Sequence, residues 1–70
     1  PGPSESELDL ITKAMAWRYE GEIVTQNLRD TLAHEIDLFL RRHYPGYTYK
    51  SVRVESTPIS SKDIRTVLEF

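Results

Sequence analysis

A long helical repeat in the middle of the chain limits what this sequence can fold into more than any other feature. Apolar side chains recur there every three or four residues: Leu28, Leu32, Ile36, Phe39, Leu40 and Tyr44. Thr25 or Asn27 offers a side-chain cap at the start, and Pro45-Gly46 prevents the helix from continuing. We therefore predict one long helix at residues 26–43.

A shorter helix is predicted before it. Ser4 followed by Glu7 is the capping-box pattern, so this helix should begin near Glu5. Its apolar residues form two neighbouring stripes, with Leu8, Ile11 and Met15 in one and Leu10, Ala14 and Trp17 in the other. Such a wide apolar arc indicates contact with more than one neighbour. Gly21 is placed to end the helix, and residues 22–24 should form a short extended link.

The last third of the chain predicts two strands, at residues 47–55 and 64–70, from its alternating β-branched and aromatic residues. The phase of the first strand is inconsistent. Its two tyrosines fall on one face, whereas its two valines fall on the other, so we expect either a bulge near Lys50-Ser51 or a strand that is apolar on both faces. Turn residues that include Pro58 separate the strands.

These elements predict a single α+β domain over residues 1–70, with a flexible N-terminus at residues 1–4. The two helices should pack on one face of a small antiparallel two-stranded sheet that neighbouring chains can extend. A chain of 70 residues without Cys has a small core and no disulfide to stabilise it, so self-association is expected. The last strand ends at the final residue, and it should pair with the first strand, a neighbouring subunit, or both.

Charge is distributed unevenly along the chain. Residues 1–40 carry three basic and eight acidic groups, whereas residues 41–70 carry six basic and three acidic groups. Opposite charges on the two halves of the chain favour head-to-tail self-assembly, or a basic face that binds a polyanion. No apolar run is long enough for a membrane span, and no signal-peptide pattern is present, so we expect a soluble, unexported protein without a membrane partner.

Enzymatic signatures are absent from the sequence, which contains no Gly-rich phosphate loop, nucleophile elbow or paired-Cys spacing. Asp30, His34 and Asp37 share one helix face, as the ligands of a zinc or manganese site would. The same stripe continues to Arg41, however, which favours a solvated face of paired charges. We therefore expect no catalytic residue, no cofactor and no metal.

Basic and aromatic residues alternate near the end of the long helix and after it. The residues concerned are Arg41, Arg42, Tyr47, Tyr49, Lys50 and Arg53. Such a combination binds phosphates and stacks bases, so a small RNA- or single-stranded-DNA-binding module is the alternative function. The same residues also have ordinary structural roles, because arginine is favoured at a helix C-terminus and tyrosine is common in strands.

The open sheet edges favour a protein partner. Lys50, Arg53 and Glu55 can protect the first strand from unwanted pairing, whereas Leu68 and Phe70 have only Glu69 beside them. Two interpretations of Leu68 and Phe70 follow. Either both side chains fill the core of the monomer, or a neighbouring chain pairs with the strand by β-augmentation.

The order of helix, polar link, long helix, strand, loop and terminal strand resembles the C-terminal module of contractile phage tail sheath proteins. The similar segments are Glu20-Gly21-Glu22 for the link, residues 27–40 with Phe39-Leu40 for the helix, Val52-Arg53-Val54 for the first strand, Asp63-Ile64 for the turn and Val67-Leu68-Glu69-Phe70 for the last strand. Small sheath-initiator and baseplate-wedge proteins of the same tails look similar too.

This resemblance implies a structural role without enzymatic activity. The chain would be a small component of a phage tail or a related contractile injection machine, found in the virion or the host cytoplasm. Its terminal strands would join sheets of neighbouring subunits in a homo- or hetero-oligomer. The residues that would carry the sheet contact are Val52, Val54, Leu68 and Phe70.

Overall fold

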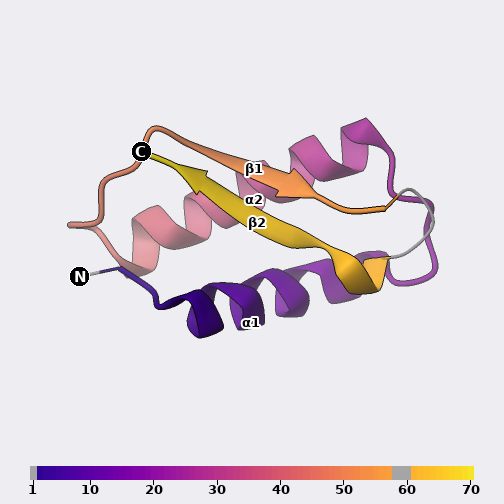
Figure 1. Cartoon of the computed structure of the whole chain (residues 1–70), viewed down its shortest axis with the longest axis horizontal. Helices are drawn as coiled ribbons and strands as arrows, with labels where there is room; N and C mark the ends of the chain where they lie inside the picture. Colours follow the sequence, from indigo (N-terminus) through magenta and orange to yellow (C-terminus); the bar gives the residue numbers. More distant parts are fainter. Residues whose placement is uncertain (1, 58–60) are drawn as a thin grey trace.

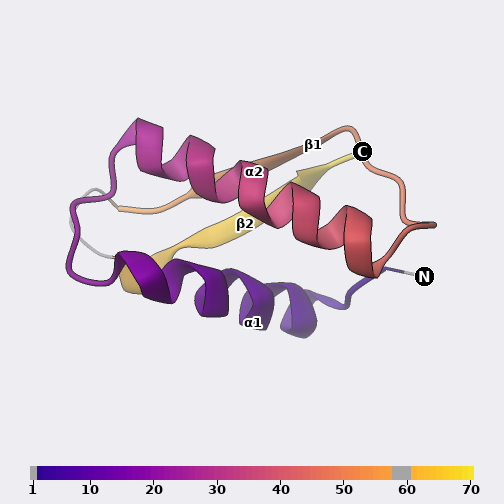
Figure 2. The same cartoon turned by 180° about the vertical axis from the view of Figure 1, so that it is seen from behind.

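The computed structural model describes residues 2–57 and 61–70. Its elements in chain order are α1 (Glu5–Ala16), the short 3₁₀ helix η1 (Trp17–Tyr19), α2 (Gln26–His43), β1 (Ser51–Glu55), a second 3₁₀ helix η2 (Ser61–Asp63) and β2 (Arg65–Glu69). The strands form an antiparallel pair, with α2 behind it and α1 alongside β2, as the front and back views show (Figures 1 and 2). The predicted α+β class is confirmed.

Helix α1 begins where the capping box predicts. The Ser4 side-chain oxygen accepts a hydrogen bond of 3.1 Å from the Glu7 N–H, and the Glu7 carboxylate accepts one of 2.9 Å from the Ser4 N–H. The helix ends earlier than expected, because after Ala16 the chain tightens into η1. Gly21 then has a φ of 86°, a backbone conformation that only glycine adopts without strain, and this residue turns the chain towards α2.

Helix α2 spans the residues predicted for it. The two predicted caps were Thr25 and Asn27, and the N-cap is Thr25, because its side-chain oxygen accepts a hydrogen bond of 3.1 Å from the Leu28 N–H. Three apolar residues on one face, Leu32, Ile36 and Leu40, are completely buried. The central helical repeat of the sequence therefore forms the middle of the core.

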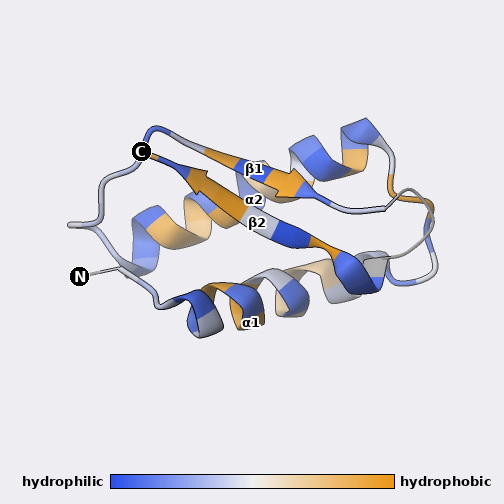
Figure 3. Cartoon of the chain, viewed as in Figure 1, coloured by the Kyte–Doolittle hydropathy of each residue, from blue (hydrophilic) through white to orange (hydrophobic). Residues whose placement is uncertain are grey.

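The first strand is shorter than predicted. It begins at Ser51, so the predicted strand is wrong for residues 47–50, which form the connection from α2. Because both tyrosines lie in this connection, the apparent conflict of phase disappears, and Val52 and Val54 share the face that packs on the helices. Apolar and polar residues alternate along β1 (Figure 3). The predicted turn at Pro58 lies outside the described residues.

One buried hydroxyl joins α1 to β2. Thr12 is completely buried, and its hydroxyl donates a 2.7 Å hydrogen bond to the Leu8 carbonyl oxygen. The Thr66 hydroxyl lies 2.7 Å from the Thr12 hydroxyl oxygen. Because a hydroxyl has a single proton, Thr66 must be the donor in this second bond. The pair fixes the position of α1 beside the outer edge of β2.

Candidate partner-binding site

A groove runs between the outer edge of β2 and the N-terminal part of α1. In the part of the chain that the structure describes, β2 pairs with β1 alone, so its other edge faces this groove. One section, of about 260 Å³, is lined by Leu8 of α1 and by Tyr47, Leu68 and Phe70. A second section, of about 230 Å³, shares Leu8 with the first and continues along the strand to Arg65. We call these two sections the β2 groove.

Aromatic rings form one end of the β2 groove. The Phe70 ring stands nearly perpendicular to the Tyr47 ring, with 6.1 Å between their centroids, and the centroid of the Tyr49 ring is 5.6 Å from that of Tyr47. Gly2 lies against the Tyr47 ring so closely that a Cβ there would overlap it. Phe70 remains 72% exposed, so this end of the groove offers an apolar surface to another molecule.

The four residues predicted to bind a partner do not share one surface. Val54 belongs to the core, with 5% of its surface exposed, and Val52 packs against that core. Leu68 is opposite Val52 in the strand register and packs against the core too, although it also reaches the groove. Of the four, therefore, Leu68 and Phe70 line the β2 groove, whereas the two valines cover α2.

The outer edge of β1 is polar. A hollow of about 360 Å³ beside it is lined by α2 residues that include Asp30, His34 and Asp37, together with Lys50 and Ser51. Among the residues that the structure describes, no group of three His, Asp or Glu side chains could hold a metal ion. Asp37 instead forms an ion pair of 3.1 Å with Arg41.

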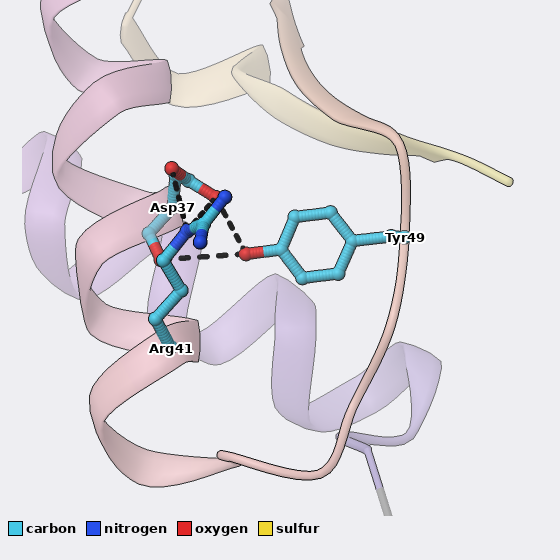
Figure 4. Close-up of polar contacts among 3 residues, drawn as sticks. All are labelled: Asp37, Arg41 and Tyr49. Atoms are coloured by element: carbon cyan, nitrogen blue, oxygen red, sulfur yellow. Dashed lines mark hydrogen bonds and ion pairs between the residues drawn. The ribbon is translucent and has the colours of Figure 1, made fainter.

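Tyr49 completes this polar cluster from the connection before β1. Its ring points towards α2, and its hydroxyl donates a 2.6 Å hydrogen bond to the Asp37 carboxylate (Figure 4). The hydrogen bond from Tyr49 lowers the pKa of Asp37, and Arg41 adds to this effect. Burial, with the Asp37 carboxylate nearby, raises the pKa of Tyr49 to about 12. The cluster is suited to hold the connection on α2.

Four of the six residues of the alternative nucleic-acid surface lie near one another, because Arg41 and Lys50 line the same hollow and the Tyr47 and Tyr49 ring centroids are 5.6 Å apart. Arg41 and Tyr49 contact Asp37, and Tyr47 belongs to the aromatic end of the β2 groove. Arg53 forms ion pairs with Glu55 and Glu69. The side chains of Arg42 and Lys50 make no hydrogen bond or ion pair with other described residues. Arg41, Tyr49 and Arg53 thus already contact acidic residues of the chain itself.

Leu8 and Tyr47 line the β2 groove but were not predicted as partner-binding residues. Leu8 was assigned to the core stripe of the first helix, and Tyr47 was assigned to the alternative nucleic-acid surface. No local pattern identifies their role, because their approach to Phe70 depends on how α1 and the connection pack against β2.

No protein-family model matches this chain, and neither a curated protein nor a solved structure matches it. A membrane-crossing helix, which needs a long apolar stretch, does not occur within residues 2–57 and 61–70. The functional argument therefore rests on the geometry of the chain itself.

Proposed function

We propose that this chain is a non-enzymatic assembly protein that binds a neighbouring subunit along the β2 groove. The observation that carries the proposal is the groove itself, in which an unpaired strand edge lies beside apolar side chains and ends at the exposed Phe70 ring. In β-augmentation, main-chain hydrogen bonds hold the added strand and its alternate side chains enter pockets. Leu8, Tyr47 and Phe70 would form such a pocket here.

The contrast between the two sheet edges supports β2 as the joining strand. Charged residues line the hollow beside β1, among them Asp37, Arg41 and Lys50. Charged side chains are a common means of preventing pairing at an edge strand. Charged residues line the β2 groove as well, among them Glu5 and Arg65, so the difference between the two edges lies in the Tyr47 and Phe70 rings, which the hollow beside β1 lacks.

The resemblance to the tail sheath module makes the proposal more concrete. The observed order of elements is the order on which that resemblance was based. On this basis the chain is a small component of a phage tail or a related contractile injection machine, located in the virion or the host cytoplasm. Its neighbours would be copies of itself or other tail proteins.

Sedimentation of the full chain tests the proposal. We expect oligomers whose mass rises with concentration, together with slower amide hydrogen exchange in residues 65–69 as they form. Phe70→Asp should reduce both effects, because it places a carboxylate in an apolar pocket. Leu38→Asp is the matched control, since Leu38 is 53% exposed on α2 and lies outside the groove. A monomer at every concentration, with unchanged exchange in β2, would contradict strand-mediated self-assembly.

A double charge reversal separates this function from the nucleic-acid alternative. Arg42→Glu with Lys50→Glu removes the two cations of the predicted nucleic-acid surface that have no polar side-chain contact among the described residues. Assembly through β2 should be unaffected by this change, whereas binding of single-stranded RNA would be lost. If the unaltered chain binds no RNA even at low ionic strength, the alternative is excluded, because phosphate contacts are strongest there.

A further inference from the structure

The outer edge of β2 presents main-chain groups at alternate residues. The Glu69 carbonyl oxygen accepts a 2.6 Å hydrogen bond from the Lys50 N–H, so the main-chain groups of Glu69 point towards β1. In an antiparallel strand, the N–H and C=O groups of successive residues point to opposite sides. Those of Thr66 and Leu68 therefore point away from β1, into the β2 groove. No hydrogen bond joins them to α1 or to another described residue.

Two side chains of opposite charge line the β2 groove beside Thr66. Glu5 lies on the α1 wall and Arg65 on the strand wall, and both residues line both sections of the groove. Neither side chain forms an ion pair or hydrogen bond with another described residue. Asp9 also lines the groove, but it already pairs with Lys13. The groove therefore offers one carboxylate and one guanidinium to the charges of a partner.

A strand added antiparallel to β2 would bond the free main-chain groups in one register. The residues opposite Leu68 and Thr66 are then two positions apart on the added strand, so their side chains share one face. This face is the helix side, because Leu68 packs on the core and Thr66 reaches Thr12 of α1. The first of the two side chains enters the aromatic end of the groove, and the second lies beside Glu5. The next residue of the added strand is opposite Arg65.

We propose that the β2 groove binds an extended segment of a partner with a fixed pattern: an apolar residue, any residue, a basic residue and an acidic residue. The segment pairs antiparallel with β2, the orientation that is slightly more stable per residue. Its apolar side chain fills the aromatic end, its basic side chain pairs with Glu5, and its acidic side chain pairs with Arg65. This inference rests on the proposed function, because it names the occupant of the same groove.

The β2 strand of a second copy matches the groove less well than this pattern. Antiparallel pairing about Val67, the centre of the strand, would place Leu68 of the second copy opposite Thr66 and beside Glu5. Thr66 of that copy would lie at the aromatic end. An apolar side chain would thus meet the charged section, and a hydroxyl would meet the apolar one. We therefore expect the patterned segment to displace copies of the chain from the groove.

A synthetic peptide tests the proposed partner directly. The acetylated sequence Ser-Thr-Leu-Thr-Lys-Glu-Thr carries the pattern, and NMR spectra of the full chain with up to about 1 mM peptide measure its binding. We expect amide hydrogen exchange to slow at Thr66 and Leu68, and much less at Val67, whose N–H points to β1. The peptide should also lower the sedimenting mass of any oligomers. Absence of binding at about 1 mM would overturn the proposal.

An exchange of charges tests the two ion pairs. A second peptide, in which Lys and Glu trade places, should bind the native chain about fivefold more weakly, because each charge then meets its like. Glu5→Lys with Arg65→Glu should reverse this preference, which a loss of folding cannot do. Glu22→Lys is the control, since Glu22 is exposed and lies outside the groove. A double variant that keeps the native preference would refute the charged contacts.

The reversed peptide, Thr-Glu-Lys-Thr-Leu-Thr-Ser, tests the orientation, because it presents the same side chains to the groove only when it runs parallel to β2. Equal or tighter binding of this peptide would overturn the antiparallel arrangement.

The outcomes also separate this inference from the proposed function. Oligomers that depend on Phe70 but neither bind the patterned peptide nor lose mass with it would refute the patterned segment and leave assembly intact. A chain that is monomeric at every concentration and still binds the peptide would refute self-assembly and support the patterned segment.

Discussion

Tyr49 and Asp37 are 12 positions apart in the sequence, and the Tyr49 hydroxyl donates a 2.6 Å hydrogen bond to the Asp37 carboxylate. The same carboxylate pairs with Arg41 one turn further along α2. This contact holds the connection before β1 on the helix, and it thereby determines where the first strand can begin. Tyr49 and Arg41 are both engaged with Asp37, although the nucleic-acid hypothesis required their side chains to be available to a ligand.

We predict that Tyr49→Phe destabilises the fold by about 1–2 kcal/mol, because it removes a hydrogen bond to a charged acceptor and leaves Asp37 with Arg41 alone. The measurement is the free energy of unfolding in urea. Tyr47→Phe is the matched control, since the contacts of Tyr47 are made by its ring. Equal effects of the two substitutions would show that the Tyr49 hydroxyl contributes no specific stability.

Stability should depend on pH through the same pair. The pKa of Asp37 is lowered in the fold. The ionised Asp37 carboxylate therefore contributes its full stabilisation of the fold above the ordinary pKa of 3.8, and this stabilisation is lost as the pH falls through the lowered pKa. The pKa of Tyr49 is raised to about 12, so its contribution is complete below 10.0 and is lost as the pH rises towards 12. Urea unfolding at a series of pH values should show less acid dependence in Asp37→Asn and less alkaline dependence in Tyr49→Phe. Unchanged slopes in both variants would contradict this assignment.

The two threonines between α1 and β2 should be energetically coupled. Thr12→Val removes the bond to Leu8 and leaves the Thr66 hydroxyl without its acceptor, so we expect a loss of about 1–3 kcal/mol. Thr66→Val should cost less, because Thr12 can still donate to Leu8. The double variant should cost less than the sum of the two, with a difference of about 0.5 kcal/mol or more. Thr31→Val, at an exposed position of α2, is a control, and simple additivity would argue against the bond.

Gly21 should tolerate alanine poorly. Its φ of 86° lies in the left-handed region, and a Cβ there would meet no atom within 4 Å, so the cost is one of backbone conformation alone. We expect Gly21→Ala to destabilise the fold by about 1–2 kcal/mol. Gly46→Ala is the control, because a Cβ there is also in open space but its φ is not positive. That variant should be neutral or slightly stabilising, and similar losses for both would refute the conformational explanation.

The helices could be predicted from the sequence because their signals are local. The capping box of Ser4 and Glu7 determines the start of α1, and the helical repeat with Thr25 at its start predicts the bounds of α2. Each of these signals involves residues no more than one turn apart, so no knowledge of the tertiary structure is needed.

The β segment was predicted less well because its limits depend on distant contacts. Residues 47–50 have strand-like composition, but Tyr49 is drawn to Asp37 and Tyr47 to Phe70, so pairing starts only at Ser51. The candidate site was affected in the same way. Val52 and Val54 were predicted to meet a partner, yet α2 packs against them.

The sequence by itself determined the fold class, the helices and the two segments that pair. Only the tertiary structure decided which apolar side chains remain outside: Val54 is buried under α2, whereas Leu10, Trp17 and Phe70 are exposed. The physical reason is that apolar periodicity shows which residues share a face of one element, but not which face another element covers. That choice depends on the packing of all the elements together, and it is what leaves Leu10, Trp17 and Phe70 exposed.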